Sequence, residues 1–299
     1  MAGSAPGSAK PRFGWIDVGV LAVLAAAAAY VVHRVDAVLH YRWDWSGVWV
    51  YLLRIDPRTG DWALGLLLKG FITTLRLALF GIILAALVGL VFGLARTSKR
   101  LFPRLVAGLY VELVRNMPPL VFIFIFYFFL SSQIVPLLGI DRLAATTSPA
   151  LAGLIELAFG DRRLLANFVS GLFCLVLFEG AYITEIVRAG VLSIDKGQWE
   201  AGDSLGLTRL QRMRLVILPQ ALRRILPALA GQFIMLVKTS SIVSLISIQE
   251  LTFIATEVAV TSGRVFEIWI LVALLYFAVS ALLSLAFHRL ERGAAAPAH

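Results

Sequence analysis

Six long runs of apolar residues decide what this chain can fold into. Each run is 17 to 25 residues long, and they lie near residues 16–32, 71–95, 118–136, 164–187, 225–248 and 267–288. A helix that crosses a bilayer needs about 20 apolar residues. Hydrophobic residues make up 60% of the chain and charged residues only 15%, which is more apolar surface than a soluble fold of 299 residues can bury. The sequence therefore predicts an all-α integral membrane protein with six transmembrane helices.

The distribution of Lys and Arg predicts the orientation in the membrane. If the N-terminus is cytoplasmic, the inside segments carry 15 basic residues and the outside segments carry 9. Lys and Arg accumulate in the cytoplasmic loops of membrane proteins. The densest cluster, in loop 96–104, consists of Arg96, Lys99, Arg100 and Arg104. We therefore expect a multi-pass protein with both termini in the cytoplasm, and these loops account for the net charge of +9 without a nucleic-acid partner.

The first apolar run has two interpretations. Lys10 and Arg12 precede it and alanines fill positions 25–29, as in a secretory signal peptide. A retained helix is favoured, because His33, Arg34 and Asp36 follow directly and no small-residue cleavage site lies at that end. Residues 1–15, rich in small residues and proline, are expected to form a disordered cytoplasmic tail.

Aromatic residues are dense in the outside segment 33–70. They are Tyr41, Trp43, Trp45, Trp49, Tyr51 and Trp62. Such residues gather at the boundary between membrane and water. We expect a helix lying on the outer membrane surface; a small soluble cap is the alternative, but the segment lacks an apolar core of useful size.

Several classes of function find no support in the sequence. It contains no nucleotide-binding loop of the form G-x-x-x-x-G-K-[ST], so energy from ATP would have to come from a separate subunit. The histidines lie at membrane edges or in the tail, at His33, His40, His288 and His299. Such positions cannot build a buried metal site or a Ser-His-Asp triad. Cys174 is the single cysteine, which excludes an internal disulfide. A membrane enzyme or sensor is therefore poorly supported, and we expect no catalytic residue, metal or cofactor.

The longest cytoplasmic segment, 188–224, carries the most specific signal. Gln198 to Leu205 can form a short helix, after which Gly206 permits a left-handed turn. Pro219 interrupts the chain again before it re-enters the membrane. A short rigid helix that ends at a glycine is suited to docking into a groove of a partner protein.

At these residues the chain resembles the permease subunits of ATP-binding-cassette (ABC) importers. Their signature is E-A-A, three residues, glycine, nine residues and I-x-L-P. The matching residues here are Glu200, Ala201, Gly202, Gly206, Val216, Leu218 and Pro219. Gly202 replaces the second alanine and Val216 replaces isoleucine. A glycine in a helix costs about 0.5–1 kcal/mol relative to alanine, so we expect a slightly looser docking helix.

Further motifs resemble the polar amino-acid branch of these permeases, whose members carry histidine, glutamine, arginine or glutamate and aspartate. The matching residues are Gly70, Thr74 and Leu75; Arg115, Pro118 and Leu120; Ala181, Tyr182, Glu185 and Arg188; Leu218 to Arg223; and Lys238, Thr239, Ser240, Ser241 and Ile242. The resemblance covers about residues 68–292. It implies a five-helix permease core, preceded in this chain by one extra N-terminal helix.

The resemblance also implies the partners and the mechanism. The permease would pair with a second permease, either the same chain or a related one, in the bacterial inner membrane. Two ATPase subunits would bind beneath, and a separate soluble or lipid-anchored protein would deliver substrate from outside. The ATPases would dock on the loop helix, at Trp199, Glu200, Ala201, Gly202, Leu205, Gly206 and Pro219. The expected domains are a tail (1–15), the extra helix with its periplasmic segment (16–67), the permease domain (68–292) and a C-terminal tail (293–299).

Charged residues at membrane depth need an explanation, because insertion scales put their cost at about 2.5–3.5 kcal/mol. Glu179 lies in the fourth run, and either pairs with a base on a neighbouring helix, such as Lys238, or lines the substrate route. Glu185 with Arg188, and Glu112 with Arg115, are spaced for local ion pairs of structural importance. The candidates for the substrate route are Glu179, Tyr182, Gln232, Lys238, Thr239 and Ser240.

The substrate class follows only from a comparison of charges. Similar permeases that carry basic amino acids often have acids at two positions where this chain has Gln232 and Thr239. Both residues are neutral here, which favours neutral polar or acidic amino acids. An ABC permease for another small solute is the alternative.

Overall fold

The computed structural model describes residues 14–145 and 148–294. Most of the expected N-terminal tail and residues 295–299 of the C-terminal tail lie outside these ranges. The chain divides into two compact units, Met1–Trp45 and Ser46–His299.

The first unit contains one helix, α1 (Trp15–Leu39). Its segment Trp15–Arg34 is long and apolar enough to cross a bilayer, so the first apolar run forms a helix, as expected. Three aromatic residues follow the helix. The Tyr41 and Trp43 rings meet edge to face at 5.3 Å, and the Trp43 and Trp45 rings stack at 6.2 Å.

The second unit opens with a small hairpin instead of the surface helix that we expected, so that prediction is wrong. A short 3-10 helix, η1 (Trp49–Tyr51), leads into the antiparallel strands β1 (Leu53–Ile55) and β2 (Trp62–Leu64). Leu53 pairs with Leu64 and Ile55 with Trp62. The intervening D-P-R-T-G-D sequence explains the turn: Gly60 has a φ of 74°, which side chains disfavour, and its N–H donates to the Asp56 carbonyl at 2.8 Å.

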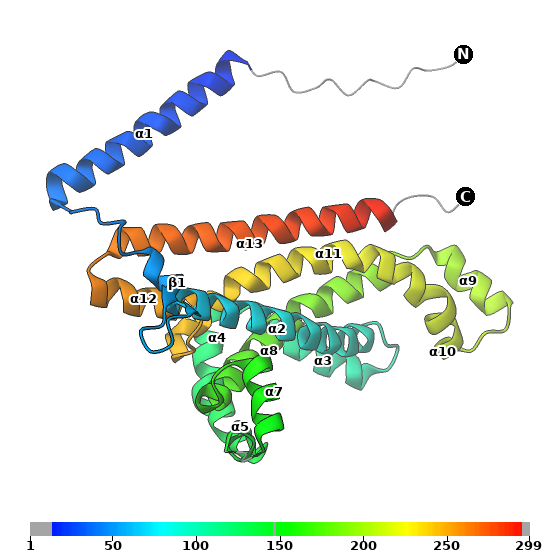
Figure 1. Cartoon of the computed structure of the whole chain (residues 1–299). Helices are drawn as coiled ribbons and strands as arrows, with labels where there is room; N and C mark the ends of the chain where they lie inside the picture. Colours follow the sequence, from blue (N-terminus) through cyan, green and yellow to red (C-terminus); the bar gives the residue numbers. More distant parts are fainter. Residues whose placement is uncertain (1–13, 146–147, 295–299) are drawn as a thin grey trace. The chain divides into compact units, whose positions relative to one another are not determined.

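The helices of the second unit supply the other five spans (Figure 1). In chain order they are α2 (Leu66–Arg96), α3 (Leu101–Arg115), α4 (Pro119–Ile125), η2 (Phe126–Ser131), α5 (Ser132–Leu137), α6 (Ile140–Ala144), α7 (Pro149–Phe159), η3 (Arg162–Leu164), α8 (Leu165–Leu192), α9 (Lys196–Ser204), α10 (Arg209–Arg212), η4 (Met213–Ile217), α11 (Leu218–Thr239), η5 (Ser240–Ile246), α12 (Leu251–Ser262) and α13 (Val265–Ala294). Here η2 and η4 are π-helical, and η3 and η5 are 3-10 helices.

Six helical segments of the described chain are long and apolar enough to span a membrane, which confirms the predicted fold class. The fifth span differs most from its predicted bounds. Helix α11 begins at Leu218, before the predicted start at residue 225, and it ends at Thr239, where the tighter η5 takes over. The early start is possible because Pro219 lies in the first turn of α11, where a helix loses little from a missing N–H.

Helices α2 and α8 pack closely through glycines. A Cβ atom at Gly93 would lie 2.6 Å from the Cβ of Val187, and Gly89 is similarly crowded by Ile183. Small residues let helix backbones approach in a membrane, where association depends on van der Waals contact. This close contact makes α8 the central helix of the unit, with α3 and α11 also packed on it.

A buried carboxyl group joins three helices at the end of the unit near the hairpin. Glu250 caps α12, because one oxygen accepts the Phe253 N–H at 2.9 Å. The other oxygen accepts hydrogen bonds from Thr74 of α2, at 3.1 Å, and Tyr276 of α13, at 2.9 Å. Burial raises the pKa of Glu250 above the value of an exposed carboxyl group.

We predict that Glu250→Ala lowers the free energy of unfolding by about 3 kcal/mol, because it leaves several buried partners without a hydrogen bond. Glu250→Gln should cost less than about 1 kcal/mol, because the amide keeps the shape of the carboxyl group and can still hydrogen-bond these partners. Thermal or denaturant unfolding of the purified protein in detergent measures both. Glu257→Ala, an exposed change on the same helix, is the control. Equal effects of the three changes would contradict this role.

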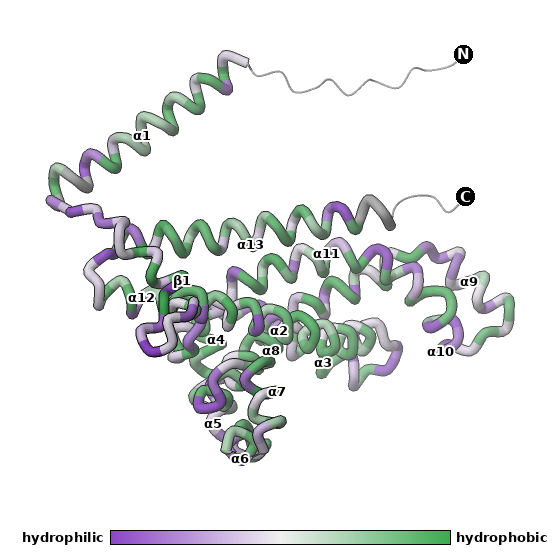
Figure 2. Tube along the Cα trace, in the orientation of Figure 1, coloured by the Kyte–Doolittle hydropathy of each residue, from purple (hydrophilic) through white to green (hydrophobic). Residues whose placement is uncertain are grey.

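The two ends of the second unit differ in character. Helices α9 and α10 lie at the end away from the hairpin and α12 (Figure 1). Hydrophilic residues gather along α9 and α10, whereas α2, α11 and α13 are largely apolar (Figure 2). Polar α9 and α10 therefore form a projection from an apolar helical unit.

Candidate functional site

The projecting loop contains the short helix that the sequence predicts. Helix α9 covers Lys196–Ser204, two residues earlier than expected at its start. Gly206 has a φ of 69°, its N–H donates to the Asp203 carbonyl at 3.0 Å, and the Leu207 N–H donates to the Gly202 carbonyl at 3.1 Å. This pair of bonds is a Schellman motif, which requires a left-handed residue such as glycine. The predicted turn at Gly206 is therefore confirmed.

Helix α10 follows at once and has its own cap. The Thr208 hydroxyl accepts the Gln211 N–H, and the Gln211 side chain accepts the Thr208 N–H at 2.9 Å. This capping box fixes where α10 starts. As a result α9 and α10 are joined by a short connection with defined ends.

Arg212 of α10 holds α9 in place. Its guanidinium forms an ion pair with Asp203 and lies 5.5 Å from the centre of the Trp199 ring. It also donates to the Trp199 carbonyl at 3.4 Å. The Arg212 side chain is almost fully buried, although arginine is seldom buried unless it is paired. Sequence reasoning missed this residue, because its partners become visible only when α9 folds back on α10.

Gly202 of α9 packs against Arg212 of α10. It is buried, and a Cβ atom there would lie 2.8 Å from the Arg212 Cδ. Arg212 therefore covers the surface of Gly202. The absent side chain makes room for the arginine that fixes the helix.

The remaining loop residues divide into exposed and inward-facing groups. Glu200 and Ala201 are exposed, and Leu205 is 76% exposed. Trp199 is half-buried against the cluster around α8 and α11. The Gln198 side chain accepts a hydrogen bond from Gln220 of α11 at 3.0 Å, one residue after Pro219. The exposed residues thus form a surface on α9, and α9 is hydrogen-bonded to α11 through Gln198.

A second group of polar residues lies deep between α8 and α11. Glu179 is buried, and its carboxylate accepts hydrogen bonds from Gln232 and from Thr239, the latter at 2.7 Å. Lys238 is exposed and does not form an ion pair with Glu179, so the interpretation as a Glu179–Lys238 pair is wrong. Ser240 is buried and donates to the Val237 carbonyl at 2.7 Å.

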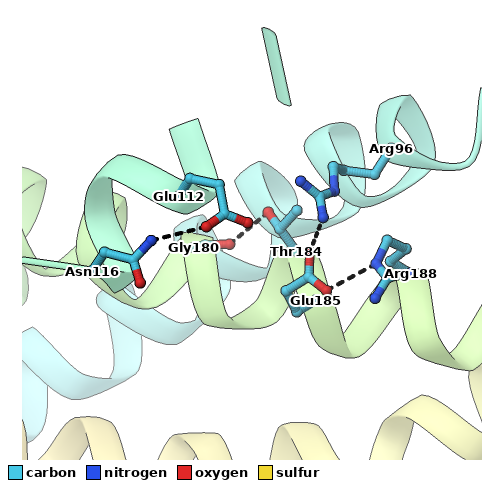
Figure 3. Close-up of polar contacts among 7 residues, drawn as sticks. All are labelled: Arg96, Glu112, Asn116, Gly180, Thr184, Glu185 and Arg188. Carbon is cyan, nitrogen blue, oxygen red and sulfur yellow. Dashed lines mark hydrogen bonds and ion pairs between the residues drawn. The ribbon is translucent and has the colours of Figure 1, made fainter. Parts of the chain in front are cut away.

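Glu185 of α8 is linked to Arg96 of α2 and to Arg188 of its own helix, as Figure 3 shows. Its oxygens lie 2.8 Å from Arg188 and 3.0 Å from Arg96. The predicted pair with Arg188 is confirmed, and Arg96 adds a link between the helices. The predicted Glu112–Arg115 pair is wrong: Glu112 accepts a hydrogen bond from Asn116 at 2.8 Å, and Arg115 lies over the Tyr182 ring at 5.4 Å.

A small cavity opens beside this group. It has a volume of about 250 Å³ and is lined by Val111, Glu112, Arg115, Asn116 and Tyr182. It therefore presents a carboxylate, a guanidinium and an amide next to an aromatic ring. Of these residues, only Tyr182 is among the substrate-route candidates from the sequence. Glu112 and Arg115 were not considered for the route, because their spacing led us to assign them to an ion pair with each other. No group of three or more His, Cys, Asp or Glu side chains is placed to hold a metal ion in the described ranges.

Comparison with known proteins agrees with the motifs. The family described as "Binding-protein-dependent transport system inner membrane component" matches residues 81–295. The glutamine transport system permease protein GlnP of Escherichia coli (strain K12) is 34% identical over 251 residues, covering 84% of this chain and 97% of GlnP. The probable glutamine ABC transporter permease protein GlnP of Bacillus subtilis (strain 168) is 38% identical over 232 residues, covering 76% of this chain and 93% of that protein.

Two further relatives extend the comparison. The glutamate/aspartate import permease protein GltJ of Escherichia coli (strain K12) is 32% identical over 249 residues, covering 83% of this chain and 94% of GltJ. A solved structure, described as the crystal structure of an amino acid ABC transporter with histidines, is 33% identical with a TM-score of 0.60. It covers 76% of this chain and 93% of the solved one. The resemblance to ABC importer permeases is confirmed, and this chain belongs to the family of binding-protein-dependent transport system inner membrane components.

Proposed function

We propose that this protein is the permease subunit of an ABC importer that moves amino acids across the bacterial inner membrane. ATP is hydrolysed on separate subunits, which dock on α9, so the permease is a translocation subunit rather than an enzyme. The observation that carries the proposal is the α9–α10 projection, whose exposed face is held rigid by Arg212. A docking element must move as a body to transmit force, and a flexible loop would deform instead.

The contacts of α9 suggest how motion at the ATPases reaches the membrane. Helix α9 follows α8 after a short connection, and Gln198 is hydrogen-bonded to Gln220 of α11. Arg224 of α11 also donates to the Ser193 carbonyl at the end of α8. A displacement of α9 therefore acts on α8 and α11 together. These two helices carry Glu179, Gln232 and Thr239, so the polar group lies where an alternating-access movement would open and close a route.

The cavity beside Tyr182 supports an amino acid as the substrate. An amino acid is a zwitterion, and Arg115 and Glu112 supply the charges that match its carboxylate and ammonium groups. Asn116 can donate or accept a hydrogen bond, and the Tyr182 ring provides an apolar wall. A volume of about 250 Å³ is suited to one amino acid rather than a peptide or sugar oligomer.

Neutral polar or acidic amino acids are the proposed substrates. Gln232 and Thr239 already donate to both oxygens of Glu179, which leaves that carboxylate less able to bind a cationic side chain. The named relatives that transport glutamine, or glutamate and aspartate, agree with this choice. Tyr182, Lys238 and Ser240 are further candidates for the route.

The proposed assembly contains a second permease, two ATP-binding subunits and a substrate-binding protein. Residues 68–292 form the permease domain, and residues 16–67 add the extra helix and the periplasmic segment. The exposed residues Glu200 and Leu205 meet the ATPase, where apolar anchors dominate interface energies.

Uptake by the complete complex tests the proposed function. The complex is purified with its ATPase and binding protein, reconstituted in proteoliposomes, and supplied with labelled glutamine, glutamate or arginine. We expect ATP-dependent uptake of glutamine or glutamate. Preferred uptake of arginine would contradict the substrate class, whereas uptake of a different small solute alone would favour the alternative permease function.

The proposed orientation has both termini in the cytoplasm. A cysteine introduced at Ser98 should be protected from an impermeant thiol reagent outside intact cells, and one at Thr59 in the hairpin turn should react. Cys174 is fully buried, so the unmodified protein should give little background. Labelling is measured by mass spectrometry, before and after permeabilisation. Reaction of the Ser98 cysteine in intact cells would overturn the orientation.

A further inference from the structure

A larger cavity lies at the end of the second unit near the hairpin. It has a volume of about 730 Å³. Its walls come from the first turns of α2, the end of α7, the start of α8 and the segment before α12. This cavity does not include any of the residues of the proposed substrate route, so it calls for a separate explanation.

The charges around the cavity are unbalanced. Both of its carboxylates have partners: Glu156 pairs with Arg162 at 3.2 Å, and Asp161 accepts the Arg163 N–H at 2.9 Å. Arg76 donates through Nη2 to the carbonyls of Glu156 and Leu157, at 3.2 and 2.8 Å, which fixes the end of α7 on α2.

Two cationic side chains remain. Lys69 and Arg163 line the cavity and are exposed, and the described residues provide no carboxylate within ion-pair distance of either. The cavity therefore offers two positive charges to an anion that is not part of this chain.

The walls beneath these charges are apolar. They include Leu66, Ile72, Phe159, Leu164, Phe168 and Ile254. The cavity also lies at the level where spanning segments begin, because Lys69 is in the first turns of the span Leu66–Arg96 and Arg163 opens the span Arg162–Leu192. Trp62, which is 74% exposed, precedes Leu64 of the cavity wall, and exposed tryptophans mark the boundary between membrane and water.

We propose that this cavity binds an anionic phospholipid, with the headgroup phosphate between Lys69 and Arg163 and part of an acyl chain along the apolar wall. Free phosphate or a soluble carboxylate could match the charges, but neither would use the apolar wall. The geometry places the lipid in the leaflet where α2 and α8 begin. Only its assignment to the outer leaflet rests on the proposed orientation.

Native mass spectrometry of the purified permease in detergent tests this site. The protein is titrated with phosphatidylglycerol or with phosphatidylcholine of the same acyl chains. We expect wild type to retain phosphatidylglycerol preferentially. The double change Lys69→Gln/Arg163→Gln should weaken this binding about 25-fold, because each basic residue near an anionic lipid contributes about fivefold. The matched control Arg58→Gln/Arg142→Gln removes two exposed charges that do not line the cavity and should have no such effect.

Three results would overturn the proposal: equal retention of the two lipids by wild type, equal loss in the control pair, or displacement of the lipid by millimolar inorganic phosphate, which would identify a free-phosphate site. The double change Lys69→Arg/Arg163→Lys keeps both positive charges and should still bind phosphatidylglycerol. This variant distinguishes a loss of charge from a loss of folding. Failure of the uptake or orientation experiments would leave these lipid measurements unchanged, so the two proposals can fail independently.

Discussion

Replacing Arg212 with alanine should leave the protein folded in the membrane but reduce substrate-stimulated ATP hydrolysis by the complex about tenfold or more. The change removes the ion pair to Asp203, the hydrogen bond to Trp199 and the packing on Gly202. A hydrogen bond to a charged group contributes about 1.5–3 kcal/mol, so its loss alone is enough to free α9 from a single position. The ATPase would then displace α9 without moving α8 and α11.

Two controls make this prediction specific. Arg209→Ala removes the same charge from an exposed position of α10 and should leave hydrolysis and uptake close to wild type. Arg212→Lys keeps the charge but loses the planar fork, so it should give an intermediate result. ATPase co-purification, stimulated hydrolysis and uptake are measured for each variant. An Arg212→Ala complex that hydrolyses ATP and transports normally would show that α9 needs no such support.

Replacing Glu179 with glutamine should reduce uptake about tenfold or more, while the protein remains folded. The amide can still hydrogen-bond Thr239 and Gln232, so the packing of α8 on α11 survives. The ionisable carboxyl group, which is costly at membrane depth and is retained there for a purpose, is lost. Uptake and thermal stability are measured side by side. Normal uptake by Glu179→Gln would assign the residue a structural role.

A companion change tests the charge argument for the substrate. Gln232→Glu places a second carboxylate against Glu179 and makes the group more anionic. We expect the ratio of arginine to glutamine uptake to rise about tenfold, as expected for about 1.4 kcal/mol of differential interaction. Gln232→Asn, which stays neutral, should leave this ratio unchanged. An unchanged ratio in Gln232→Glu would remove Gln232 from the determinants of specificity.

The sequence predicts the spans well because membrane insertion depends on local hydrophobicity, which is readable one run at a time. It also predicts α9 and the turn at Gly206, since a helix cap is a local feature. The hairpin around Gly60 is a counterexample. Aromatic content favoured a helix on the membrane surface, whereas the turn-forming sequence between Asp56 and Asp61 determined the structure.

The candidate site is harder to predict, because its contacts join residues distant in the chain. Glu179 meets Gln232 and Thr239 only when α8 packs on α11, so the sequence alone suggested Lys238 as its partner. Spacing alone also misassigned Glu112 to Arg115. An i, i+3 spacing allows an ion pair but does not require one. Glu112 instead interacts with Asn116, and Arg115 lies over Tyr182.

The glycine-lined contact between α2 and α8 limits how this protein can change shape. Sliding one helix along the other would move the Val187 and Ile183 side chains off Gly93 and Gly89 and against neighbouring residues that carry side chains. The glycines contribute no flexible side chains that could adjust to such a displacement, so α2 and α8 are expected to move as one rigid body. The link from Glu185 to Arg96 fastens the same pair near one end. In the proposed alternating-access movement, α2 and α8 would therefore stay together while α11 turns against them.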